Sequence, residues 1–167
     1  TGGTEKGVPA TPGALNQAVA PERYGGFILK WDFQSSRFLF AASLSNVAEN
    51  SEVDYSGAVH FSSPAWSPQE SITIGALSAG GTQLLYSAVI PNPTDYSFQS
   101  QSLRSISRGD NGDVAVLNSY SVYGQAAGGF SERLWMSVYS TSERRMRFQR
   151  FLNERGGWGQ VRLTSTG

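Results

Sequence analysis

Apolar and polar residues alternate along much of the chain, starting just after Tyr24. In the stretch FILKWDF, the large apolar side chains all fall on one side of an extended backbone: Phe27, Leu29, Trp31 and Phe33. Lys30 and Asp32 fall on the other side. A period of two is typical of a strand with one buried face. We therefore expect a half-buried strand here, with its aromatic side toward a core.

The same alternation recurs at intervals of roughly 10–15 residues in nine candidate segments, from which we expect about eight strands. The candidate segments are 27–33, 37–44, 57–61, 71–77, 82–90, 113–124, 133–140, 144–152 and 158–163. Short strands joined by polar turns favour an all-β fold, an antiparallel β-sandwich or jelly-roll-like domain.

Turn residues divide these segments. The stretch RGDNGD (108–113) contains Asn111-Gly112, a pair that favours a type I′ hairpin. The stretch PNPTDYS (91–97) reads as a loop, because its two prolines cannot donate to a strand ladder. The stretch NERGG (153–157) predicts a hairpin that joins the last two strands.

The amino-terminal region has a different composition. Residues 1–13 are rich in Gly, Thr and Pro, as in linkers. The stretch 11–19 predicts one short helix, with Thr11 as N-cap and Pro12 in its first turn. We therefore divide the chain into a linker with a short helix, 1–23, and a β domain, 24–167.

Charge is balanced overall but not locally. The chain has 13 basic and 13 acidic residues, yet residues 133–162 hold seven arginines against Glu143 and Glu154. Alternation over 144–152 predicts an arginine face with Arg145, Arg147 and Phe151, and an opposite face with Met146, Phe148 and Leu152. That arginine face is either an ordinary solvated surface or a contact for another copy of the chain or an acidic glycan. A neutral domain without a nucleic-acid motif argues against nucleic acid.

Composition excludes other classes. The chain has no Cys, and therefore neither disulfides nor thiolate metal sites. No run of about 18 apolar residues is present, so we expect no membrane insertion. We also expect no cofactor and no metal, since DNGD lacks the remaining ligands of a calcium loop.

Catalytic patterns are weak. The single histidine, His60, lies within a predicted strand, where a satisfied neighbour or solvent is its expected partner. The stretch ALSAG (76–80) resembles a nucleophile elbow, but strand rather than helix is predicted after it. A carboxylate pair for glycan hydrolysis could come from two groups: Glu49, Glu52 and Asp54, or Asp110 and Asp113. We expect no enzyme activity, with glycan hydrolysis as the alternative.

Aromatic residues near Pro and Gly are better candidates for a ligand site. Their flanking residues place three of them outside regular strands: Trp66, Tyr96 and Tyr123. Such rings either fill the edge of a core or stack on sugar faces. Together with Asn111 in its turn, they form our set of expected ligand-binding residues.

The two ends of the chain resemble bacteriophage tail fibres. GTEKGVPATPGALNQAV (3–19) resembles an element of the fibre shaft just before the receptor-binding tip; the matching residues are Gly3, Thr4, Lys6, Gly7, Val8, Pro9, Pro12 and Leu15. RFQRFLNERGGWGQVRLTSTG (147–167) is similar to the closing hairpin of fibre tip domains, through Arg150, Gly156, Gly157, Trp158, Gly159, Val161, Leu163 and Thr164. Val161 departs from the pattern, because a second tryptophan is frequent there. Residues 25–145 carry no such resemblance.

The resemblance implies a homotrimer within the tail fibre of a virion, acting outside the cell. Such tips attach to bacterial surface glycans, lipopolysaccharide or capsule, or to an outer-membrane protein. From the arginine-rich segment itself we expect subunit or partner contacts at Arg145, Arg147, Arg150 and Trp158, with solvent beside the ligand site as the alternative. The alternatives are a glycan-degrading tip and a purely structural fibre or collar module.

Overall fold

The computed structural model describes the chain except for residues 5–9, 19–23, 64–70, 92–99, 125–128 and 154–167. The described residues form eleven strands and no helix, which confirms the all-β class. They belong to two compact units, residues 1–63 with 75–87 and residues 64–74 with 88–167.

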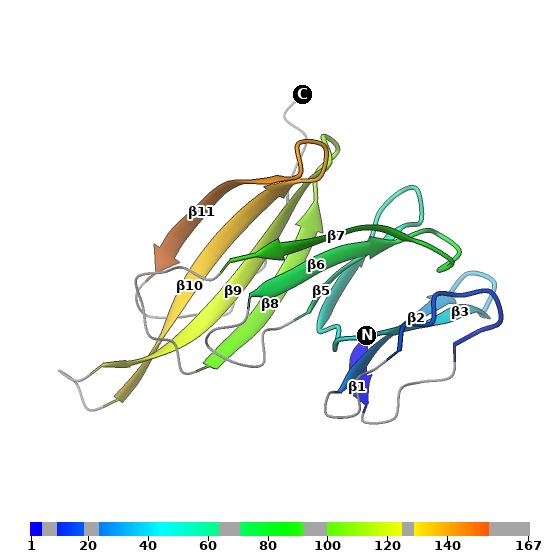
Figure 1. Ribbon diagram of the computed structural model, residues 1–167, viewed down its shortest axis with the longest axis horizontal. Helices are drawn as coiled ribbons and strands as arrows, with labels where there is room; N and C mark the ends of the chain where they lie inside the picture. The colour runs from blue at the N-terminus through cyan, green and yellow to red at the C-terminus, as the bar shows by residue number, and fades with distance from the viewer. Residues whose placement is uncertain (5–9, 19–23, 64–70, 92–99, 125–128, 154–167) are drawn as a thin grey trace. The chain divides into compact units, whose positions relative to one another are not determined.

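The strands form three open antiparallel sheets (Figure 1). The first has the order β1 (Gly2–Thr4), β2 (Gly25–Asp32), β3 (Arg37–Leu44). The second has the order β4 (Asn50–Val53), β5 (Val59–Ser63), β6 (Ile72–Leu77), β7 (Leu84–Ile90). The third has the order β11 (Arg145–Asn153), β10 (Gly129–Ser140), β9 (Asp113–Gly124), β8 (Ser100–Arg108).

Most predicted strands are present. The prediction for 37–44 matches β3 at both ends, whereas three strands have no counterpart in the prediction: β1, β4 and β8. These three are short or rich in Gly and Ser, so their sequences carry little apolar alternation. The expected strand 158–163 lies outside the described residues.

The prediction of a helix at 11–19 is wrong for residues 11–18, the part that the structure describes. Residues 10–18 instead run beside the free edge of β3, where the Thr11 amide donates to Ala41 O and the Ala41 amide donates to Thr11 Oγ1. Gly13 has φ +85°, which a right-handed helix cannot contain. A helix of two turns is marginal, so backbone hydrogen bonds to a sheet edge prevail.

Strand β2 is oriented opposite to the expectation. Ile28 is 1% exposed, whereas Leu29, Trp31 and Phe33 are 49%, 48% and 86% exposed. Lys30 lies on the core side, where its ammonium donates to the carbonyl oxygens of Gly57 and Ala79. Its aliphatic stem can cover apolar surface because two carbonyls satisfy the charged end.

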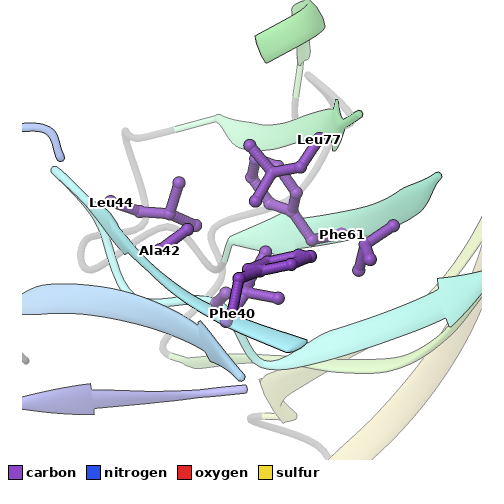
Figure 2. Packing of buried hydrophobic residues seen from close by; sticks show 8 residues of the cluster. Phe40, Ala42, Leu44, Phe61 and Leu77 are labelled. Atoms are coloured by element: carbon purple, nitrogen blue, oxygen red, sulfur yellow. The ribbon is translucent and has the colours of Figure 1, made fainter. Parts of the chain in front are cut away.

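The first unit has its core on that side of β2 and β3. Figure 2 shows side chains from β3, β5 and β6 packed together. The core residues are Ile28, Phe40, Ala42, Leu44, Ala48, Val59, Phe61 and Leu77, with Ala14, Leu15 and Leu84 against them.

In the third sheet, β9 is buried on both faces from Asp113 to Ser119. β10 pairs with β9 over its whole length, and with β11 on its other edge. β11 is interrupted by two register shifts, opposite Leu134/Trp135 and opposite Val138/Tyr139. Extra residues at such bulges change which side chains share a face.

The arginine face of β11 therefore differs from the prediction. Arg145, Phe148 and Arg150 pair with Ser140, Val138 and Met136, which alternate along one face of β10. Phe148 thus lies on the arginine side, whereas simple alternation placed it on the opposite side. The bulge at Arg147 is the cause, because it adds one residue between Met146 and Phe148.

Candidate functional site: the turn cluster of the third sheet

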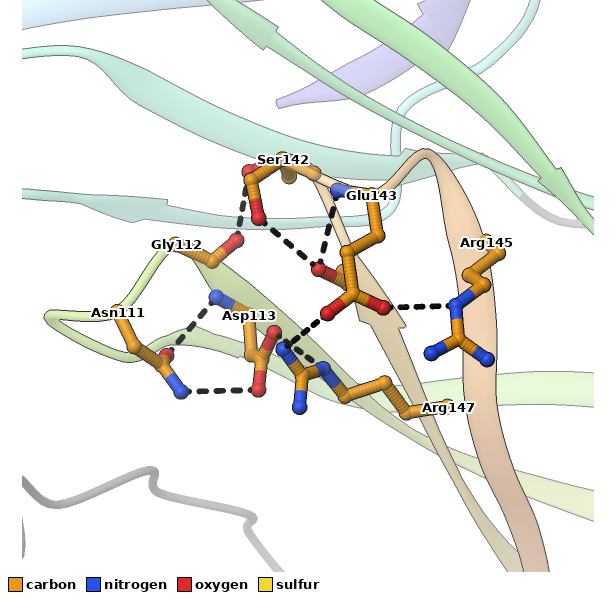
Figure 3. Close-up of polar contacts among 9 residues, drawn as sticks. Asn111, Gly112, Asp113, Ser142, Glu143, Arg145 and Arg147 are labelled. Carbon is orange, nitrogen blue, oxygen red and sulfur yellow. Dashed lines mark hydrogen bonds and ion pairs between the residues drawn. The ribbon is translucent and has the colours of Figure 1, made fainter.

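Two turns at one end of the third sheet lie side by side, the β8–β9 turn (109–112) and the β10–β11 turn (141–144). The Thr141 hydroxyl donates to Gly112 O at 2.7 Å, and the Thr141 amide reaches the same oxygen at 3.4 Å. Figure 3 shows the side chains that these turns bring together, which we call the turn cluster: Asn111, Asp113, Glu143, Arg145 and Arg147.

The β8–β9 turn is not the expected type I′ turn. That type needs positive φ at both central residues, and here Gly112 has φ +83° while Asn111 does not have positive φ. The Gly112 amide donates to Gly109 O, and the Asp113 amide donates to Asn111 Oδ1 at 3.0 Å. The Asn111 side chain thereby stabilises a longer turn, as Asn commonly does.

Asp113 links the two turns. It is 7% exposed, and its Oδ2 accepts a hydrogen bond from Asn111 Nδ2 at 2.9 Å. Its Oδ1 forms an ion pair with Arg147 Nε at 3.0 Å, although this buried oxygen makes no hydrogen bond of good geometry. A buried carboxylate without a cation would be costly, so the ion pair explains why an aspartate is tolerated here.

Two arginines share the second carboxylate. Glu143 Oε1 contacts Arg147 Nη2 at 3.1 Å, and Glu143 Oε2 contacts Arg145 Nε at 2.7 Å. The side chains of Arg145 and Arg147 are 69% and 40% exposed. Arg147 is thus held by two carboxylates, one of them buried, whereas Arg145 has one carboxylate contact and is mostly exposed to solvent.

This arrangement suits recognition of small polar groups better than attraction of a polyanion. Two arginines face two carboxylates, so the local charges cancel and the long-range field is weak. The exposed N–H groups remain donors for a hydroxyl or a single carboxylate. Asn111 is exposed at the edge of the same cluster.

The structure brings together three of the residues that sequence reasoning singled out: Asn111, Arg145 and Arg147. Arg150 is exposed on the same face of β11, farther along the strand. Trp66, Tyr96 and Trp158 lie outside the described residues. Tyr123 was expected outside regular strands, but its backbone belongs to β9 and pairs with Phe130, because the strand continues to Gly124.

A second polar group lies in the first unit. His60 Nε2 is 3.0 Å from Asp54 Oδ2, and His60 Nδ1 is 3.0 Å from the Tyr86 hydroxyl. Burial raises the pKa of Asp54, but hydrogen bonds from Ser56, His60 and the Ala58 amide outweigh it and lower the pKa to about 2. Of the two surroundings expected for His60, a hydrogen-bonded neighbour is confirmed and solvent is wrong, since His60 is 2% exposed.

Other sequence candidates for chemistry have structural explanations. Ser78 of the ALSAG stretch lies between β6 and β7, where its hydroxyl accepts the amides of Thr82 and Gln83. A nucleophile elbow requires a strand-to-helix turn, which this strand-to-strand connection is not. Within the described ranges, no group of three or more His, Cys, Asp or Glu side chains is arranged for a metal ion. The same part of the chain contains no helix that could cross a membrane.

Comparison with known proteins adds no relative: no family model, no curated protein and no solved structure matches this chain.

Proposed function

We propose that this chain is a receptor-binding domain of a bacteriophage tail fibre that attaches to a bacterial surface glycan without cleaving it. The observation that carries this proposal is the turn cluster. It presents two guanidinium groups, 69% and 40% exposed and each paired with a carboxylate, at one end of a sheet. Donors fixed before binding lose little entropy when a ligand arrives.

The proposal includes trimerisation and a sandwich-like or jelly-roll-like packing of the sheets. Single sugar contacts are weak, and three linked copies raise the apparent affinity through avidity. The all-β architecture agrees with this assignment but is shared by many unrelated functions. The resemblance of both chain ends to fibre shaft and tip elements supplies the phage context.

Adsorption to bacteria tests the proposal. The fluorescently labelled chain is incubated with a panel of bacterial strains and with their purified lipopolysaccharide and capsule. We expect binding to at least one strain, and a loss of about tenfold or more in Arg145→Ala, since a charge-assisted hydrogen bond is worth roughly 1.5–3 kcal/mol. Arg145 is well exposed, so this variant should keep its melting temperature.

Val89→Thr is the control, because it changes an exposed side chain of β7, a strand of the second sheet. If Arg145→Ala binds as tightly as the unmodified chain, the turn cluster is not the ligand site. Shortened glycan after incubation would indicate the alternative of a depolymerase. No binding to any strain or glycan would indicate a structural fibre or collar module.

A further inference from the structure

The tip of the β2–β3 hairpin exposes three aromatic rings. Trp31, Phe33 and Phe38 are 48%, 86% and 44% exposed. Trp31 and Phe38 are direct cross-strand partners, with ring centroids 6.4 Å apart and planes inclined by 50°. We call these three residues the hairpin patch; Leu29, 49% exposed, extends it along β2.

The hairpin patch is not required to build the core. The opposite face of the same two strands supplies Ile28, Phe40 and Ala42, which are at most 2% exposed. An antiparallel sheet with one buried face normally carries polar residues on the other face. Exposed rings gathered at one hairpin tip are therefore a feature that indicates binding.

Charges beside the hairpin patch cancel. Asp32 and Arg37 are cross-strand partners, one negative and one positive. The hydroxyl of Ser35 and the amide of Gln34 donate to the Asp32 carboxylate and, with Arg37, lower its pKa. An ionised, oriented carboxylate thus lies at the same end of the hairpin as Arg37, and the two charges sum to zero. This favours a neutral ligand with hydroxyl groups over an anionic one.

The exposed area of the hairpin patch also indicates how large its ligand is. A fully exposed aromatic side chain presents about 150–250 Å² of surface. At their observed exposed fractions, the three rings and Leu29 together present on the order of 400–500 Å² of apolar surface. A stable protein interface buries about 800 Å² per partner. The hairpin patch is therefore small for a subunit contact and suited to one or two sugar rings.

We propose that the hairpin patch is a binding site for neutral hexose units, whose C–H faces stack on Trp31, Phe33 and Phe38. This inference deepens the proposed attachment function and rests on it for its biological context. It names the ligand class, a neutral hexose, and a site separate from the turn cluster.

The test is a titration of the full chain with neutral oligosaccharides of glucose, galactose and mannose, followed by tryptophan fluorescence and by isothermal calorimetry. We expect millimolar or tighter binding of at least one of them. We expect Phe38→Ala and Phe33→Ala each to weaken it about tenfold or more, which corresponds to about 1.4 kcal/mol of binding free energy. Phe33 is so exposed that its truncation cannot damage the core.

Two matched controls are exposed aromatic residues elsewhere, Tyr55→Ala (82% exposed) and Phe148→Ala (45% exposed). Unchanged affinity in both supports a specific site. The inference is overturned if no neutral oligosaccharide binds, if the hairpin variants bind as tightly as the unmodified chain, or if Phe33→Ala converts an oligomer to monomers.

Failure of this inference is distinguishable from failure of the attachment function. A chain that adsorbs to bacteria but ignores neutral sugars retains the attachment function and loses the hairpin site. A chain that binds a neutral sugar through the hairpin patch but adsorbs to no strain retains the hairpin site and loses the phage context.

Discussion

At the scale of single residues, Gly81 shows how a residue without a Cβ lets a neighbouring ring pack against the backbone. It has φ +71°, and a Cβ at this position would lie 2.5 Å from the ring of Phe40. Its carbonyl also accepts the Leu15 amide. We expect Gly81→Ala to lower the free energy of unfolding by at least about 2 kcal/mol, from backbone strain plus overpacking.

Gly13 provides the matched control for this prediction. It also has positive φ, +85°, but a Cβ there would meet nothing within 4 Å. Gly13→Ala should therefore cost only the backbone strain, on the order of 1 kcal/mol. Urea denaturation of both variants measures the difference. Equal losses would show that the Phe40 ring moves aside and that overpacking contributes nothing.

The Asp54–His60 pair predicts an acid dependence of stability. The pKa of Asp54 is lowered to about 2 in the folded chain, below its ordinary value of 3.8. The stabilisation is therefore fully present above pH 4 and is lost as the pH falls toward 2. Asp54→Asn should remove this part of the acid dependence, which urea midpoints between pH 7 and pH 2.5 will measure.

Asp110→Asn is the control here, because Asp110 is an exposed turn residue. It should change the pH profile less than Asp54→Asn does. An Asp54→Asn variant with the same slope as the unmodified chain between pH 4 and pH 2.5 would contradict the proposed linkage.

At the scale of elements, the β10–β11 turn contains a strained residue. Arg144 has φ +53°, in the left-handed region that favours glycine. We expect Arg144→Gly to preserve or raise stability, by up to about 1 kcal/mol. Arg150→Gly, within β11, should instead destabilise by roughly 0.5–1 kcal/mol. Thermal melting of the two variants compares them; a lower melting temperature for Arg144→Gly would contradict the argument.

The elements also show what the sequence could predict and why. Strong alternation located β3 at both ends and gave the all-β class. Alternation alone did not tell which side of β2 is buried, since Ile28 and Trp31 are both apolar and lie on opposite faces. Nor did it show the bulge at Arg147, which depends on pairing with β10. The edge of β3 that replaces the expected helix is likewise a tertiary feature.

The candidate site was predictable only in part, for the same reason. Asn111 was identified from local turn chemistry, and Arg145 and Arg147 from local charge. Their meeting at one end of the sheet depends on two turns lying side by side, about 30 residues apart in the chain. The hairpin patch was missed because its rings were expected to form the core.

At the scale of the whole molecule, the predicted homotrimer can be tested through the arginines of β11. We expect sedimentation equilibrium at about 10 μM to give three times the mass of the 18.0 kDa chain. Charge reversal distinguishes a subunit contact from ordinary surface only at an arginine that the fold of the single chain does not need. Arg147→Glu would place a third carboxylate beside Asp113 and Glu143, and would destabilise the fold itself.

Arg150→Glu is the cleaner probe, since Arg150 is exposed on the same face and lies outside the turn cluster. If that face contacts a sister subunit, Arg150→Glu should shift the mass toward that of one chain while the melting of the monomer stays unchanged. A single-chain mass for the unmodified protein would contradict the trimer. A trimer that survives Arg150→Glu would mean that Arg150 makes no contact on which the trimer depends.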